Sequence, residues 1–282
     1  MAAIGKMPEK IETGRELVGL IPAAGSAERI SPLPCSKEIF PVGFYESDNK
    51  SGLRPKAASH YLLDKMQIAG AEKAFIVIRN GKWDIPAYFS GGDFKHMPLA
   101  FISIDASSSA PFTIDQAYPF FKNALILFGF PDILSTPDDC FCELISAQQK
   151  SNADIVLGLF KADRPQKMDM VEVDPDGRIR RIHIKPSETN LRYTWIIAVW
   201  TPRFALFIHT YLTERMMADN DKSQRLPGFS RKELYMGDVI QAAIDNHLSV
   251  DKVIFHAGKY IDIGTPDDLE RAVRTWNESG ST

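Results

Sequence analysis

The segment 23–43, AAGSAERISPLPCSKEIFPVG, holds the residues whose types and spacing best suit chemistry: a loop of small residues, then Arg29 and Lys37. The loop follows the apolar run 16–22, so it would lie at the end of a buried strand. Backbone N–H groups exposed by small residues can bind phosphate oxygens, and the two cations add positive charge beside them. The motifs GxxxxGK[ST] and GxGxxG are both absent, which excludes a Walker loop and a dinucleotide fingerprint. The segment therefore predicts a polyphosphate site of another kind, with a plain turn bearing solvated charges as the alternative.

Alternating strands and helices would position this loop. Apolar runs predict buried strands at 16–22, 74–79, 98–104, 124–129 and 153–160. Helical spacing predicts helices near 61–70, 113–122 and 139–150. This alternation is typical of an α/β fold with a mostly parallel twisted sheet and helices on both faces. Ligands of such sheets bind at the carboxyl ends of the strands, where the loop would lie.

The second half of the chain adds a small β-hairpin to this sheet. The hairpin is predicted at 170–184, around Asp-Pro-Asp-Gly. Further elements are predicted as strands at 193–200 and 251–256, helices at 202–213, 237–248 and 265–276, and a polar surface loop at 218–232. Because no linker or repeat divides the chain, we expect a single domain at 16–276, with an N-terminal extension (1–15) and a C-terminal tail (277–282).

Composition excludes several classes of protein. Apolar residues make up 44% and charged residues 24%, which excludes a disordered or fibrous chain. The net charge of −3 argues against bulk nucleic-acid binding. No apolar run approaches the roughly 18 residues of a membrane span, and the charged start does not suit export. Cys35, Cys140 and Cys142 are too few for a disulfide framework and form only a weak metal motif, so we expect reduced thiols in a cytoplasmic protein.

Five segments, in order, resemble the signatures of the sugar-1-phosphate nucleotidyltransferases. Segment 23–43 resembles that family's G-G-x-G-T-R-x-x-P and S-K-x-x-x-P-V elements. The other four are LILFGFPDIL, RIHIKP, GDVIQAAIDNHLSV and KYIDIGTPDDLERA, which resemble the L-G-D strand end, the E-K-P turn, a T-D-containing helix and W-L-D-T-G-T-P-x-x-L-x-x-A. The resemblance covers about residues 16–276 and implies the family's Rossmann-like nucleotidyltransferase fold.

The resemblance implies that a nucleoside triphosphate is joined to a sugar 1-phosphate or similar phosphorylated acceptor, with release of pyrophosphate. Its catalytic residues would be Arg29 on the departing phosphates, Lys37 at the α-phosphate and Lys185 on the attacking phosphate, with Mg²⁺ held by Asp132 and Asp262. Its nucleotide-binding positions would be Ala23, Ala24, Gly25, Ser26, Ala27, Glu28, Arg29, Asp105 and Ala110. Its acceptor-binding positions would be Asp169, Ile184, Lys185 and Trp195. No nucleic-acid or membrane partner is implied, and because relatives often form dimers or tetramers, a homo-oligomer is compatible with it.

Departures from the family pattern cluster at the base and acceptor positions. Ala27 and Glu28 replace a Gly and a Thr of the loop; Ala27 is disfavoured if φ is positive, and Glu28 places a carboxylate beside a triphosphate. Asp105 replaces a Gln and suits an exocyclic amino group, which favours cytosine or a purine. Asp169 and Ile184 replace a Gly and a Glu, and Ile184 leaves acceptor hydroxyls unpaired at a cost of about 1–3 kcal/mol each.

Three interpretations follow. The first is a working transferase with a modified sugar phosphate or a smaller, less hydroxylated phosphate as acceptor. The second is a catalytically impaired homologue acting as a nucleotide-sensing or interaction subunit. Retention of Arg29, Lys37, Asp132, Lys185 and Asp262 together favours the first. A glycosyltransferase is a third and weaker interpretation.

Overall fold

The computed structural model describes residues 14–47, 50–105, 107–220 and 233–276. The strands are β1 (Leu17–Ala23), β2 (Pro41–Ser47), β3 (Lys50–Ala57), β4 (Lys73–Arg79), β5 (Asp93–Phe94), β6 (Met97–Ile104), β7 (Leu125–Gly129), β8 (Ile133–Thr136), β9 (Ile155–Lys161), β10 (Met170–Val173), β11 (Ile179–His183), β12 (Tyr193–Trp200), β13 (Val250–Phe255) and β14 (Lys259–Asp262). The helices are α1 (Ala58–Ile68), α2 (Asp84–Tyr88), α3 (Ala110–Asp115), α4 (Cys140–Ser151), α5 (Pro202–Asn220), α6 (Met236–Asp245) and α7 (Pro266–Thr275). Three 3-10 turns are η1 (Lys37–Ile39), η2 (Tyr118–Phe120) and η3 (Pro165–Lys167).

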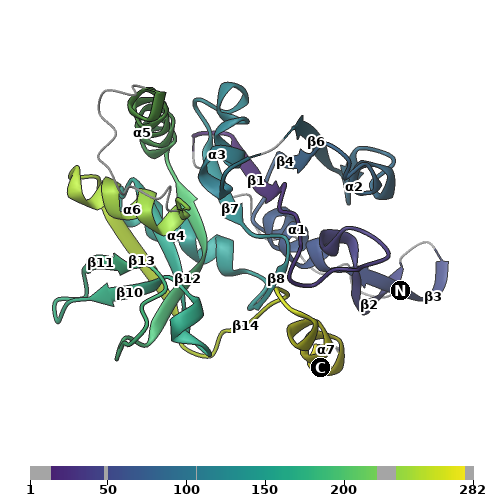
Figure 1. Cartoon of the computed structure of the whole chain (residues 1–282). Helices are drawn as coiled ribbons and strands as arrows, with labels where there is room; N and C mark the ends of the chain where they lie inside the picture. The colour runs from purple at the N-terminus through teal and green to yellow at the C-terminus, as the bar shows by residue number, and fades with distance from the viewer. Residues whose placement is uncertain (1–13, 48–49, 106, 221–232, 277–282) are drawn as a thin grey trace.

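One large sheet forms the centre of the molecule (Figure 1). Its path is β11-β10-β12-β7-β1-β4-β6-β5, and β9 and β13 continue from β12. β7, β1, β4 and β6 are parallel neighbours, whereas β12 runs antiparallel to both β7 and β9. The predicted α/β fold is confirmed. Because β7 is central, the loop after β1 and the β10–β11 hairpin lie on opposite sides of it.

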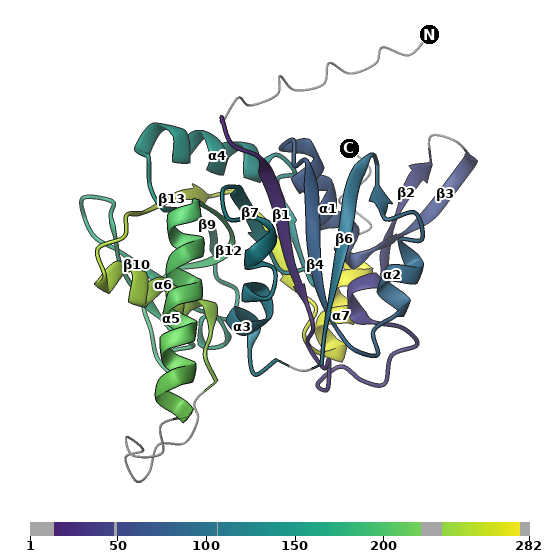
Figure 2. The ribbon, with the colours of Figure 1, turned by 90° about the horizontal axis from the view of Figure 1, so that it is seen from above.

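Helices cover both faces of this sheet, and a hydrophobic core lies between the sheet and the helices on each face. α1 and α4 pack against one face through side chains such as Leu63 and Phe141. α3, α5 and α6 pack against the other face through side chains such as Phe204 and Val239 (Figure 2). Successive side chains of a strand point to opposite faces, so these almost wholly apolar strands supply both cores.

Two small sheets were not predicted. β8 pairs antiparallel with β14, and β2 pairs antiparallel with β3. These strands are short or rich in Gly, Pro and charge, so they carry no clear two-residue period. A third core contains side chains of β2, β8, β14 and α7, together with Ile30 of the loop and Trp276. The additional strands thus fix the loop after β1 against the C-terminal part of the chain.

Several predicted boundaries differ from the structure. The helix predicted at 113–122 is wrong: α3 is short and is followed by η2, and both have a proline in their first turn. α5 continues through residues 218–220 of the predicted surface loop, and 221–232 lie outside the described residues. The hairpin is confirmed, with Asp174 Oδ1 accepting from Arg178 N at 2.7 Å. No helix in the described part of the chain is long and apolar enough to cross a membrane.

A buried histidine on α1 makes stability depend on pH. His60 is 8% exposed, and its ring lies 4.9–5.9 Å from the ring centroids of Tyr45, Tyr88, Phe89 and Phe94. Its Nε2 lies 3.2 Å from Tyr88 Oη. Burial lowers the pKa of His60 to about 4 from 6.5. Since the folded pKa lies below the unfolded one, the stabilisation is present above pH 6.5 and is lost as the pH falls towards 4.

We expect His60 to account for a loss of about 2 kcal/mol in the free energy of unfolding between about pH 7.5 and pH 5. The variant His60→Phe keeps a ring in the cluster but cannot bind a proton, so its stability should fall less over this range. Urea denaturation of both proteins at the two pH values measures the difference. The exposed His256, changed to Gln, serves as control and should behave as wild type; equal pH dependence in His60→Phe and wild type would contradict the prediction.

Candidate active site

The loop between β1 and η1 is closed by a tight turn. Ala27 has φ +56°, and its carbonyl accepts hydrogen bonds from Ile30 N (3.2 Å), Ser31 N (3.1 Å) and Ser31 Oγ (3.0 Å). Ile30 is buried in the core beside α7, whereas Glu28 and Arg29 are exposed. Among the described residues, none accepts a hydrogen bond from the N–H groups of residues 25–29. The loop therefore presents free donors and one guanidinium at the carboxyl edge of the sheet.

The positive φ of Ala27 gives a stability prediction. A left-handed conformation costs a non-glycine residue about 1–2 kcal/mol, and Gly avoids this cost, although its greater freedom in the unfolded chain cancels part of the gain. Ala27→Gly should therefore raise the free energy of unfolding by about 0.5–1 kcal/mol, measured by urea denaturation. Ala24→Gly in the same loop, where φ is not positive, should be neutral or destabilising. Equal destabilisation in both variants would be inconsistent with strain at Ala27.

Two residues that follow β4 anchor the loop at both ends, and the sequence prediction missed them. Lys82 Nζ donates to the carbonyl of Ala23 (3.0 Å) and to Glu38 Oε1 (2.7 Å). The carboxylate of Asp84 accepts from Ser36 N (2.6 Å) and Ser36 Oγ (2.8 Å). Lys82 and Glu38 are both buried. The only signal in the sequence is a lysine and an aspartate after an apolar run, a pattern too common to identify partners more than 40 residues away.

Four of the predicted residues meet beside this loop: Arg29, Lys37, Asp132 and Asp262. Lys37 in η1 donates to Asp132, which lies between β7 and β8. Ile263 N donates to the carbonyl of Asp132 at 2.9 Å, so the ends of β14 and β7 are adjacent. A Cβ on Gly264 would lie 3.3 Å from Arg29 Nη2 and 3.4 Å from Asp262 Oδ1, so both side chains lie over this glycine.

Burial and mutual charge shift the pKa values in this cluster. Burial by itself would lower the pKa of the Lys37 ammonium, but the Asp132 carboxylate outweighs it, so that pKa is raised. Burial, followed by the charge of Asp132, raises the pKa of Asp262 to about 6, while Lys37 and Arg29 act in the opposite direction. The cluster thus combines two cations with two carboxylates, one of which is reluctant to ionise.

The two carboxylates fit a magnesium ion that is completed by phosphate oxygens. Within the described residues, no group of three or more His, Cys, Asp or Glu side chains could hold a metal by itself. Mg²⁺ commonly takes one or two protein carboxylates together with substrate phosphates and water. A divalent cation beside Asp132 would also favour the ionised form of Asp262, against the shift caused by burial.

The predicted acceptor positions form a second cluster under the start of α6. Asp169 directly precedes β10, Ile184 and Lys185 follow β11, and Trp195 lies in β12. A Cβ on Gly237 would lie 2.5 Å from Ile184 Cδ1 and 2.6 Å from Asp169 Oδ2. The exposed Lys185, at φ +39°, holds its ammonium 3.7 Å from the ring centroid of Tyr235. Sequence reasoning missed Gly237 and Tyr235, although the segment GDVIQAAIDNHLSV begins at that glycine.

The two predicted base-side residues are separate from both clusters. Asp105 follows β6 and is exposed, and Ala110 is the first residue of α3. β6 is parallel to β4, so Asp105 lies at the same edge of the sheet as the loop after β1. No contact among the described residues joins Asp105 or Ala110 to the four-residue cluster.

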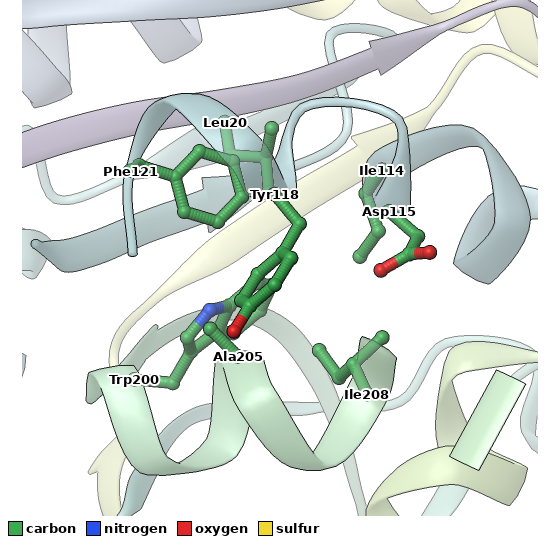
Figure 3. A pocket seen from close by; sticks show the side chains of 8 residues that line it. All are labelled: Leu20, Ile114, Asp115, Tyr118, Phe121, Trp200, Ala205 and Ile208. Carbon is green, nitrogen blue, oxygen red and sulfur yellow. The ribbon is translucent and has the colours of Figure 1, made fainter. Parts of the chain in front are cut away.

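A small cavity lies between α3 and α5 (Figure 3). It is lined largely by apolar groups, including Tyr118 and Trp200. Its one carboxylate, Asp115, is paired with His209 at 3.1 Å. It contains none of the predicted site residues.

Comparisons with known proteins identify solved structures with the same fold and a matching family. No curated protein sequence matches the chain significantly. A protein described as a glucose-1-phosphate thymidylyltransferase from Bacillus anthracis, solved with a sucrose, superposes with a TM-score of 0.72 at 17% identity over 92% of this chain and 94% of its own. The inositol-1-phosphate CTP transferase from T. maritima superposes with a TM-score of 0.63 at 17% identity over 94% of this chain and 98% of its own.

These structural likenesses show a common fold, and a sequence match supplies the family. Residues 105–279 match the family described as nucleotidyl transferase. This match spans more than half of the 282 residues. The chain therefore belongs to the nucleotidyl transferase family.

Proposed function

We propose that this protein transfers a nucleotidyl group from a nucleoside triphosphate to a phosphorylated small-molecule acceptor of the sugar 1-phosphate type. The observation that carries the proposal is the convergence of Arg29, Lys37, Asp132 and Asp262 beside a loop with free N–H groups. The two similar structures support it, since one is described as a glucose-1-phosphate thymidylyltransferase and the other as an inositol-1-phosphate CTP transferase. We assign the activity to a domain at 16–276.

The loop and its cations would bind the triphosphate. Donors at 24–29 would bind phosphate oxygens, and Arg29 would hold the β- and γ-phosphates, which leave as pyrophosphate. Lys37 would stabilise the charge that develops at the α-phosphate. The exposed position of Glu28 leaves room for its carboxylate to face solvent rather than the phosphates.

Asp132 and Asp262 would hold a Mg²⁺ ion. The ion, when bound, neutralises and aligns phosphate oxygens. In its presence Asp132 would interact with the metal, which would leave the Lys37 ammonium available to the nucleotide.

Lys185 would bind the phosphate of the acceptor. An oxygen of that phosphate attacks the α-phosphorus, one P–O bond forms, and the bond between the α-phosphorus and the bridging oxygen breaks. The electron pair leaves with pyrophosphate. Because the attacking oxygen is already ionised, no side chain has to remove a proton, and the protein acts by positioning and by compensating charge.

Pyrophosphate release tests the proposal. The assay combines Mg²⁺, each nucleoside triphosphate in turn and a panel of phosphorylated acceptors, with wild type, Asp262→Asn and the exposed Asp267→Asn as matched control. We expect release that depends on the acceptor in wild type and in Asp267→Asn, and a loss of at least about 100-fold in Asp262→Asn. Magnesium-dependent nucleotide binding without release would instead favour a nucleotide-sensing protein, and absence of binding would exclude both functions.

A further inference from the structure

We infer that the acceptor carries an ammonium group in addition to its phosphate, and that Asp169 binds that group. This inference rests on the proposed function and names the acceptor class. It draws on the position of Asp169, on the charges around it and on the chemistry of its neighbours.

The distance between Asp169 and the segment that carries Asp132 matches the length of a small acceptor molecule. In the sheet, β10 is next to β12, and β12 is next to β7, whose end leads to Asp132 (Figure 1). The pair Met170–Thr194 places Asp169 beside Trp195, and Thr194 Oγ1 donates to the carbonyl of Asp169 at 2.9 Å. Neighbouring strands are about 4.8 Å apart, so two spacings separate Asp169 from the segment after β7 by roughly 10 Å. A small phosphorylated molecule can span this length.

The carboxylate of Asp169 is held by the backbone N–H groups of Gly237 and Lys185 rather than by an ion pair with a described side chain. Its Oδ1 is buried without a hydrogen-bond partner, and no ion pair forms at this side chain within the described part of the chain. The charged groups that act on it are Lys185 and Asp238. Lys185 would be engaged by the acceptor phosphate, and Asp238 is a second carboxylate, whose Oδ2 accepts from Tyr235 N at 2.8 Å. A buried carboxylate is costly unless a cation accompanies it, and an ammonium group on the acceptor would supply that cation.

The neighbours of Asp169 suit an ammonium group better than a ring of hydroxyls. Trp195, the cross-strand neighbour of Asp169, lies 6.1 Å from Phe130 and 6.2 Å from Phe128 between ring centroids, so an aromatic cluster adjoins Asp169 in the sheet. Aromatic faces attract cations. Ile184 Cδ1 and Asp169 Oδ2 approach the same point at Gly237, so a methyl group lies beside the carboxylate. The buried, unpartnered Trp195 Nε1 adds a donor suited to an ether or ester oxygen of the acceptor.

Two kinds of molecule share this chemistry: an amino-sugar phosphate and a short phosphorylated alkanolamine. The test compares matched acceptors in the pyrophosphate assay: glucosamine 1-phosphate against glucose 1-phosphate, and phosphoethanolamine or phosphocholine against 2-hydroxyethyl phosphate. We expect kcat/KM for at least one ammonium acceptor to exceed that of its neutral counterpart by about tenfold or more. The pair that shows the preference identifies the kind of acceptor.

Variants show whether Asp169 is responsible. Asp169→Asn keeps the shape and a hydrogen-bond acceptor but removes the charge, so the preference should collapse, mainly through KM. Asp176→Asn, in the exposed turn of the same hairpin, is the matched control and should keep the preference. Thermal shift with each acceptor, measured on wild type and both variants, reports binding independently of turnover.

The outcomes separate this inference from the proposed function. Equal or better use of the neutral acceptors would overturn the inference and leave nucleotidyl transfer established. Preferential binding of an ammonium acceptor without pyrophosphate release would support the inference and overturn the proposed reaction. Neither release nor acceptor-dependent stabilisation would overturn both.

Discussion

Replacing Lys37 with Met should lower kcat for pyrophosphate release by about 10²–10³-fold, because the proposed stabiliser of charge at the α-phosphate is removed. Lys37 lies in η1 with only 16% of its side chain exposed, and it donates to Asp132. KM for the nucleoside triphosphate should rise much less, since Arg29 and the loop donors remain. Steady-state kinetics at saturating Mg²⁺ measure both constants. The exposed Lys161, changed to Met, is the matched control and should retain wild-type kinetics.

A double-mutant cycle with Asp132 distinguishes catalysis from structure. Lys37→Met leaves two carboxylates facing each other, and Asp132→Asn leaves a largely buried ammonium without its partner. Each single variant should therefore be less stable than wild type by about 1–3 kcal/mol, and the double variant should recover part of that loss. Activity should not recover. Recovery of activity in the double variant would mean that the pair serves only to hold the fold.

Replacing Lys82 with Met should reduce the free energy of unfolding by about 3–5 kcal/mol, because it leaves Glu38 as a buried carboxylate without a partner. The side chains of Lys82 and Glu38 are 10% and 3% exposed, and Glu38 Oε2 already has no hydrogen-bond partner. Burial raises the pKa of Glu38 although Lys82 lowers it. The variant would also lose the bond to the carbonyl of Ala23, where the loop begins. Urea denaturation measures the effect.

A double variant distinguishes the effect of the unpaired charge from the effect of lost side-chain packing. Lys82→Met combined with Glu38→Gln removes both charges, so it should be more stable than Lys82→Met alone by at least about 1 kcal/mol. Because this pair joins β1 to the residue next to Lys37, we also expect kcat to fall in Lys82→Met more than KM changes. A Lys82→Met protein as stable as wild type would show that the ion pair does not anchor the loop.

The sequence by itself determined the order of the main elements and the location of the phosphate loop. Apolar runs such as 74–79 and 124–129 are strands because they are short, rich in β-branched and aromatic residues, and suited to a sheet that is buried on both faces. The DPDG turn is likewise a local property, fixed by Asp174 and by the positive φ of Gly177. Types and spacing singled out Arg29 and Lys37, and the resemblance to the family added Asp132 and Asp262; the fold brings these four side chains together.

Only the tertiary structure determines which of these side chains are in contact and which distant residues hold them in place. The pairing of β8 with β14 joins residues about 130 positions apart, and neither four-residue strand carries a period that would reveal it. Lys82, Asp84 and Gly237 act through contacts with partners far away in the sequence, so no local pattern distinguishes them from ordinary surface residues. That Asp169 forms no ion pair with a described side chain is visible only once β10, β12 and α6 enclose it. Hydrophobic periodicity is a local property of the chain, whereas charge compensation depends on which distant side chains burial places side by side.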